Sequence, residues 1–178
     1  MNEIRFSRLS CENFGLNSLD DFIRYEEVKS AWRKIDGRYV LCENEYIMNW
    51  DLETCRNTAS TVYEGIRSKG FGFGAFDGDK IAGFVYVWGE LFGSRNQYIE
   101  LKLFYTSGPY RGMGIGKKLF SLACEEARKL GAEKLYISSG PTESTQAAYR
   151  KLGCVYAEEI SPAAVEKYPL DVQLEYLL

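Results

Sequence analysis

The sequence has no histidine among its 178 residues, and this absence limits the chemistry open to it. Nucleophile systems of the Ser-His-Asp and Cys-His types are excluded in their usual form, as is zinc bound through histidine. A catalytic base must therefore be a carboxylate or an ordered water. No metal is expected as a cofactor.

Cysteines and long apolar runs are also sparse. The five cysteines are odd in number and form no CxxC pair, so we expect reduced, mostly buried thiols in a cytosolic protein. The opening segment, MNEIRFSRLSCENFG, contains no signal-peptide core, and no later run approaches membrane-spanning length. We therefore predict a cytoplasmic protein that is neither secreted nor embedded in a membrane.

Positive charge is not in excess. There are 22 Lys and Arg residues against 25 Asp and Glu, which gives a net charge of −3 and a pI near 5.2. The basic surface typical of nucleic-acid-binding proteins is missing, which removes the usual reason to propose such a partner without excluding RNA contact. We expect neither a nucleic acid nor a membrane as partner.

What is present fits one globular domain over residues 1–178. The hydrophobic fraction of 46% and the charged fraction of 26% are ordinary for a soluble protein of this size. Asp36-Gly37 indicates the turn of a hairpin within 32–50, and a second Asp-Gly turn joins two strands within 71–89. The other strands are expected at 3–9, 97–106, 132–139, 154–159 and 171–178.

Four helices are expected on the two sides of this sheet. Ser18, with Leu19, Phe22 and Ile23 behind it, is typical of a capped helix start. Asp51 is the expected N-cap of an amphipathic helix that stops near Gly70. A second strong helix follows the turn at 107–113 and runs to Leu130, where Gly131 ends it, and another covers 142–153.

The most informative segment is YTSGPYRGMGIGKKLF, in which a strand ends, glycines at 112, 114 and 116 follow, and a helix begins. Glycines let the backbone approach a phosphate closely, and the helix N-terminus favours an anion. The Walker A pattern fails here because position 111 is arginine and Lys117 is followed by lysine, and the dinucleotide pattern fails on its last spacing. A strand-to-helix corner without a ligand stays an alternative.

Arg111-x-x-Gly114-x-Gly116, in the glycine-rich segment, is followed about forty residues later by a second motif, AAYRKLGC (147–154). The two are similar to the R/Q-x-x-G-x-G/A and A-x-Y-x-K-x-G-F motifs, respectively, of the GNAT superfamily of N-acetyltransferases. The likeness covers roughly residues 95–158 and implies an acetyl-CoA-binding core there, with 1–94 contributing to the acceptor site. It also implies a single-domain α/β (α+β) fold with a mixed, mostly antiparallel sheet of about six to seven strands, about four helices, and a splayed strand pair that forms the acetyl-CoA cleft.

The resemblance assigns acetyl-CoA as co-substrate and places its binding residues. The backbone of the strand before the turn would hold the pantetheine arm, and the turn would hold the pyrophosphate. From the charges around the turn itself, we also expect Arg111, Lys117 and Lys118 to add positive charge at its rim. The implied acetyl-CoA-binding residues are Phe104, Tyr105, Thr106, Arg111, Gly112, Met113, Gly114, Ile115, Gly116, Lys117 and Thr142. Thr142 stands where the family often has asparagine and is also a reasonable helix N-cap.

Two residues are candidates for catalysis. Tyr149 stands where the family often places the tyrosine that protonates the departing CoA thiolate, although a tyrosine packed under the sheet is the alternative. Glu100 is the candidate base, because family members often recruit a carboxylate from this strand. Strand alternation alone allows Glu100 to be a solvated residue, and water is the other candidate base.

The acceptor is expected to be an amine, attacked directly in a ternary complex. A small molecule is favoured over a protein or peptide amine, and a faint likeness to antibiotic-acetylating members is present at Tyr98-Ile99-Glu100 and Tyr168-Pro169. A binding module that keeps the CoA pocket without turnover, as a sensor or scaffold, is the second function class. A homodimer is left open.

Overall fold

A seven-stranded sheet forms the centre of the structure, a computed structural model in which residues 3–178 are described. The strand order is β1-β4-β5-β6-β7-β9-β8, and every neighbouring pair is antiparallel except the parallel β6 and β7. This confirms the predicted fold class. The strands are β1 (Arg5–Arg8), β4 (Phe71–Asp77), β5 (Lys80–Phe92), β6 (Tyr98–Thr106), β7 (Lys134–Ser139), β8 (Val155–Tyr156) and β9 (Val172–Leu177).

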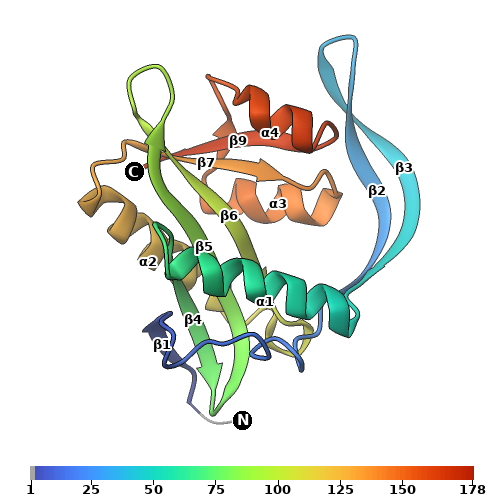
Figure 1. The fold of residues 1–178 in the computed structure, drawn as a ribbon. Helices are drawn as coiled ribbons and strands as arrows, with labels where there is room; N and C mark the ends of the chain where they lie inside the picture. Colours follow the sequence, from blue (N-terminus) through green and yellow to red (C-terminus); the bar gives the residue numbers. More distant parts are fainter. Residues whose placement is uncertain (1–2) are drawn as a thin grey trace.

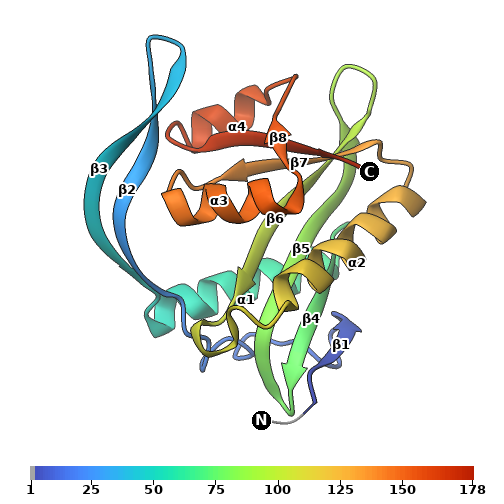
Figure 2. The same cartoon turned by 180° about the vertical axis from the view of Figure 1, so that it is seen from behind.

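Helices cover both faces of the sheet, as expected (Figures 1 and 2). On one face, α1 buries Cys55, Ala59 and Val62 in the same core as Phe84 of β5. On the other face, α2 and α3 share a core with the opposite side of β4 and β5. The helices are α1 (Leu52–Ile66), α2 (Ile115–Lys129), α3 (Glu143–Leu152) and α4 (Pro162–Lys167), with a short 3₁₀ helix, η1 (Gly108–Tyr110).

The predicted helix ends are largely confirmed. The Asp51 carboxylate accepts a hydrogen bond from the Thr54 N–H at 2.8 Å and caps α1. This helix ends at Ile66, and the Gly70 N–H then donates to the Gly65 carbonyl. Gly131 has a φ of +87° just beyond α2, a left-handed conformation that suits glycine and ends the helix.

The predicted helix after Ser18 is wrong. Residues 11–13 and 16–21 form turns, and the Ser18 hydroxyl accepts from the Gly15 N–H at 2.9 Å instead of capping a helix. The Ser18 N–H and the Phe22 N–H each donate to a carbonyl three residues earlier. The turns still bury Leu19 and Phe22. The apolar pattern therefore indicated correctly which residues are buried but not that they form a helix.

A separate hairpin, β2 (Tyr25–Ile35) and β3 (Arg38–Asn49), stands to one side of the sheet (Figures 1 and 2). Its turn at Asp36-Gly37 is as predicted, with both residues at positive φ, but its first strand begins at Tyr25, not near 32. The Trp32 N–H donates to the Pro141 carbonyl at 2.8 Å, so the hairpin lies against the start of α3.

The cysteine side chains are present as thiols. All five cysteines are free, and Cys55, Cys124 and Cys154 are buried. Burial raises the pKa of the Cys124 thiol to about 11 and that of Cys154 to about 12, which keeps both protonated.

Within residues 3–178, no helix is long and apolar enough to span a membrane.

Candidate active site

The sheet opens between its two parallel strands. β6 pairs with β7 only where Tyr98, Ile99 and Glu100 face 134–136, although β6 continues to Thr106. Beyond Glu100 the strands diverge (Figure 1), while β6 keeps its pairing with β5 up to Thr106. In the described part of the chain, the β7-facing edge of 101–106 has no partner strand. The splayed strand pair is therefore as predicted, and Phe104, Tyr105 and Thr106 lie along its open part.

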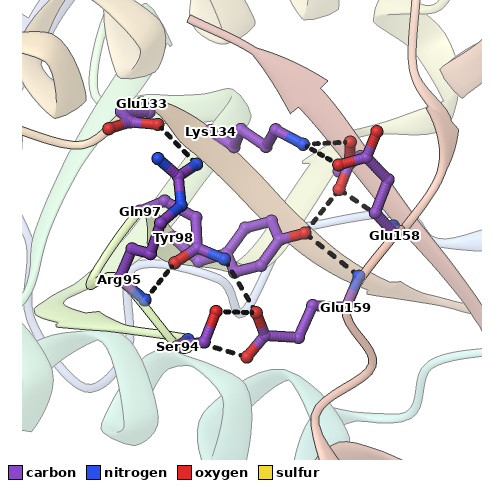
Figure 3. Close-up of polar contacts among 9 residues, drawn as sticks. Ser94, Arg95, Gln97, Tyr98, Glu133, Lys134, Glu158 and Glu159 are labelled. Carbon is purple, nitrogen blue, oxygen red and sulfur yellow. Dashed lines mark hydrogen bonds and ion pairs between the residues drawn. The ribbon is translucent and has the colours of Figure 1, made fainter.

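Polar side chains hold together the end at which β6 and β7 still pair, among them Tyr98, Lys134, Glu158 and Glu159 (Figure 3). Together with Glu175 we call these residues the closed-end cluster. The Tyr98 hydroxyl donates to Glu175 Oε2 at 2.5 Å, and Lys134 Nζ donates to Glu175 and Glu158 at 2.7 Å each. Burial would raise the pKa of Glu175, but the hydrogen bonds from Lys134 and Tyr98 lower it overall. Glu175 thus stays ionised within this cluster.

The glycine turn lies beyond the opposite, open end of β6. Gly112 and Gly114 have φ values of +80° and +79°, and a Cβ built at either would meet no atom within 4 Å. Gly114 is the N-cap of α2, and in the described chain this helix start has no side-chain cap and no acidic residue in its first turn. Met113, Lys117 and Lys118 are exposed beside it. Free N–H groups and open space favour an anion here.

Ile115 and Gly116 connect the turn to the core. Ile115 is buried in the cluster beneath α2. A Cβ at Gly116 would lie 3.5 Å from the Phe104 ring and 3.6 Å from Thr106 Oγ1. Because Gly116 has no side chain, the first turn of α2 can lie against β6. The glycine turn and the open edge of β6 are therefore adjacent.

The Arg111 side chain holds the backbone near the turn. Its Nη1 donates to the Tyr25 carbonyl at 3.1 Å and its Nε to the Thr106 carbonyl at 3.4 Å, which links the hairpin to the end of β6. Burial and then the nearby Arg24 lower the Arg111 pKa. Arg24 Nη1 lies 2.9 Å from Glu26 Oε2, an ion pair without a well-directed hydrogen bond.

Tyr149 lies in the second half of α3 with 8% of its surface exposed. Its ring centroid is 6.1 Å from that of Phe104, so it packs under the open part of β6. Within residues 3–178 its hydroxyl has no hydrogen-bond partner. Burial, then Tyr105, Cys154 and Asp171, raise its pKa. The phenol is thus a protonated donor at neutral pH.

Thr142 is the N-cap of α3. Its Oγ1 accepts from the Thr145 N–H at 3.3 Å and donates to Thr145 Oγ1 at 2.8 Å, and the residue is 2% exposed. Its hydroxyl is thus committed to the helix start, where the structure places it beside Ala31 of the hairpin.

Glu100 points to the sheet face that carries α1, since its neighbours Ile99 and Leu101 lie in the core on the other face. Its side chain is 28% exposed and Lys102 Nζ lies 3.3 Å away. Its charge contributes, after burial, to the raised pKa of Tyr136. Glu100 is therefore half-buried and already paired with a cation.

Asp171, which the sequence analysis did not select, lies just before β9. It accepts a hydrogen bond from the Ser138 hydroxyl at 3.0 Å. Burial raises its pKa, and the bond from Ser138 partly offsets this. The signal in the sequence was weak: an aspartate after Tyr168-Pro169 and before an apolar strand. Only the position of β9 beside β7 brings it near Tyr149.

Comparison with known proteins decides the family. The model of the acetyltransferase (GNAT) family matches residues 31–154, which is more than half of the chain. The chain belongs to the GNAT acetyltransferase family. The match includes both the glycine turn and Tyr149, the two features that had carried the resemblance.

Two curated relatives match parts of this GNAT protein. The mycothiol acetyltransferase of Corynebacterium glutamicum is 38% identical over 88 residues, which are 47% of this chain and 27% of that protein. The uncharacterized N-acetyltransferase YvbK of Bacillus subtilis is 30% identical over 105 residues, 58% of this chain and 65% of that protein. The chain thus spans less than two thirds of either relative.

Solved GNAT structures share the fold. A protein of Bacillus anthracis provisionally assigned as a streptothricin acetyltransferase, solved with acetyl coenzyme A, has a TM-score of 0.70 at 16% identity over 99% of both chains. Nourseothricin acetyltransferase gives 0.62 at 18% identity, over 97% of this chain and 95% of that one. The PaiA N-acetyltransferase of Thermoplasma acidophilum, solved with coenzyme A, gives 0.62 at 16% identity over 99% of both. At these identities the likeness concerns the fold alone.

Proposed function

We propose that this GNAT protein is an N-acetyltransferase that moves the acetyl group of acetyl-CoA to a primary amine of a small molecule. The observation that carries the proposal is the open edge of β6 leading to an uncapped, glycine-lined helix start. An extended strand edge suits the amide-bearing pantetheine arm, and exposed N–H groups at a helix start suit its diphosphate. The two features are adjacent and in the order that one CoA molecule requires.

In this proposal the backbone of the open strand edge binds the pantetheine and the turn binds the diphosphate. Arg111 acts through its backbone and by fixing the turn, because its guanidinium already bonds two carbonyls. Lys117 and Lys118 are placed to attract the phosphates, while the hydroxyl of Thr142 serves α3. The proposed contacts are the backbones of Phe104, Tyr105, Thr106, Gly112, Met113, Gly114, Ile115 and Gly116.

Tyr149 is the proposed general acid. A phenol kept protonated by burial can donate to the thiolate that leaves as the thioester breaks. Its position beneath the open part of β6 is where the sulfur end of a pantetheine arm on that edge would lie. General acid catalysis of this kind contributes about 10²–10⁴ in rate, so the loss of the hydroxyl should be easily measured.

The proton acceptor in this scheme is a carboxylate near the splay or a water, with Glu100 as the candidate predicted from the sequence. Positioning of amine and thioester supplies much of the remaining rate, since effective molarities of about 10⁵ M or more are available to well-oriented groups. A small acceptor is supported by aromatic side chains on the sheet face toward α1, where Trp50 packs against Tyr105 and Trp88 donates a hydrogen bond to Glu90. It is also supported by structural relatives that are named for nourseothricin and streptothricin.

The first experiment is thermal unfolding with CoA, acetyl-CoA and ATP compared. CoA and acetyl-CoA should raise the Tm and ATP should raise it less. A panel of amines is then tested for thiol release from acetyl-CoA. Tyr149→Phe should lower turnover at least tenfold while the CoA-induced Tm shift persists. Binding of CoA without thiol release for any amine would favour the alternative, a CoA-binding sensor without turnover.

A further inference from the structure

We propose that Asp171 is the carboxylate that binds the ammonium group of the acceptor and takes its proton. This inference rests on the proposed function and adds a residue to it. Asp171 lies at the first position before β9, and its N–H donates to the Tyr168 carbonyl at 3.1 Å. The turn after α4 therefore fixes where its side chain starts.

A chain of hydrogen bonds holds one oxygen of this carboxylate. Ser138 Oγ donates to Asp171 Oδ2 at 3.0 Å, Gln173 Nε2 donates to Ser138 Oγ at 3.1 Å, and the Tyr136 hydroxyl donates to Gln173 Oε1 at 2.6 Å. The other oxygen, Oδ1, has no hydrogen-bond partner among residues 3–178, and no Lys or Arg there lies within ion-pair distance. A half-buried carboxylate with a free oxygen and no cation is suited to receive one.

Asp171 also lies close to the proposed chemistry. Its charge contributes to the raised pKa of Tyr105, behind burial, and to that of Tyr149, behind burial, Tyr105 and Cys154. Val172, the residue after Asp171, is buried in the same core cluster as Tyr149 of α3, and Phe104 from the open part of β6 packs against that cluster. Asp171 therefore lies where β9 reaches the splay. An amine held by Asp171 would therefore meet the thioester end of a pantetheine arm on β6.

Two other carboxylates, Glu100 and Glu26, are already paired with cations. Glu100 lies 3.3 Å from Lys102 Nζ, and Glu26 lies 2.9 Å from Arg24 Nη1. An ammonium group at either would compete with a resident cation, whereas at Asp171 it would relieve the cost of burying an unpaired charge. This difference distinguishes Asp171 from Glu100 as the proton acceptor.

The reaction balances with these groups. The ammonium gives one proton to Asp171, and the neutral amine attacks the thioester carbonyl, which forms the C–N bond. The C–S bond then breaks, Tyr149 protonates the thiolate, and the tyrosinate takes the second proton from the acetylated nitrogen. Asp171 releases its proton to solvent, so that one proton is released for each acetyl group moved.

The test compares Asp171→Asn with Glu100→Gln, using an alkylamine that the wild type acetylates and the hydrazide of similar shape, which is uncharged at neutral pH. We expect Asp171→Asn to lower kcat/KM for the alkylamine at least 100-fold but for the hydrazide less than tenfold, with the CoA-induced Tm shift unchanged. Glu100→Gln should lower kcat/KM for the alkylamine less than Asp171→Asn does, and Glu90→Gln, in an exposed ion pair with Lys69, is the control that should leave both unchanged. Equal losses on both acceptors, or a larger loss from Glu100→Gln, would overturn the assignment.

A second variant keeps the carboxylate and changes only its pKa. The hydrogen bond from Ser138 lowers the Asp171 pKa, so Ser138→Ala should raise it, and the acid limb of kcat/KM, where Asp171 becomes protonated, should move to higher pH. Ser138 from β7 contacts the carboxylate, and the phenols of Tyr105 from β6 and Tyr149 from α3 feel its charge; the pKa of each phenol is raised, chiefly by burial, so both stay protonated across this range. An unmoved acid limb would also overturn the assignment. If the wild type acetylates no amine, the proposed function itself fails and this inference with it.

Discussion

Replacing Gly114 by alanine tests whether the start of α2 binds the diphosphate of CoA. Gly114 has a φ of +79°, and a Cβ there would meet no protein atom within 4 Å. A side chain in this conformation costs about 1–2 kcal/mol. The Tm should therefore fall by about 2–4 °C for each kcal/mol in a domain of this size. Because the protein has room for the methyl group, any loss of CoA affinity beyond this strain comes from the ligand.

Gly131 provides the matched control at the other end of the same helix. It has a φ of +87°, and a Cβ there also meets nothing within 4 Å. Gly131→Ala should therefore lower the free energy of unfolding by a similar amount. It lies far along α2 from the proposed site, so CoA affinity should stay at the wild-type value.

The assay is thermal unfolding of the three proteins with and without CoA at about 100 times the wild-type Kd. CoA then adds about 2.7 kcal/mol to the wild type and to Gly131→Ala, a Tm shift of roughly 5–11 °C. A tenfold weaker Kd in Gly114→Ala reduces the gain to about 1.4 kcal/mol and halves the shift. Equal shifts in the two variants would refute the placement of the diphosphate at this turn.

Two further predictions concern stability. Glu175→Gln should lower the free energy of unfolding at neutral pH by about 3 kcal/mol, because it leaves Lys134 without a buried partner, whereas Glu90→Gln, in an exposed ion pair, should cost less than about 1 kcal/mol. The pKa of Glu175 is lowered in the folded protein, so its contribution to the free energy of unfolding is complete above the ordinary carboxyl pKa. That contribution is lost as the pH falls through the lowered pKa. The urea midpoints of the wild type and of Glu175→Gln should therefore converge in acid. Gly65→Ala should cost about 1–3 kcal/mol in urea unfolding, because its Cβ would overlap the buried Tyr86 hydroxyl; an unchanged midpoint would contradict this packing.

Features fixed by local chemistry were predictable from the sequence. The cap at Asp51, the turn at Asp36-Gly37 and the glycine at 131 depend on side chains and φ angles within a few residues. The short helix α4 was predictable in the same way, because Ser161 followed by Pro162 is a helix start, yet it was missed. The prediction of a helix after Ser18 was wrong because the spacing of its apolar residues fits buried turns as well as a helix.

The environment of the site depended on distant contacts. Asp171 lies beside β7 only because β9 inserts between β7 and β8, and no local pattern gives that strand order. The spacing of Glu100 and Lys102 in the sequence suggests that they pair. Nothing in the sequence indicates that Asp171 has no cation beside it among the described residues. The start of β2 was hidden for another reason: this strand belongs to a two-stranded hairpin and buries few side chains, so alternation is weak.

The short junction between β6 and β7 means that a small rotation there displaces the far end of β6. Only three residue pairs join the two strands, and Thr106 lies six residues past the last of them, about 20 Å away at the usual rise of a strand. A rotation of about 3° at the junction would move that far end by about 1 Å, and misplacement by 1 Å can cost about 100-fold in rate. Substitutions around Tyr98 and Lys134 are therefore expected to change the rate of the proposed acetyl transfer without any contact with the proposed substrates.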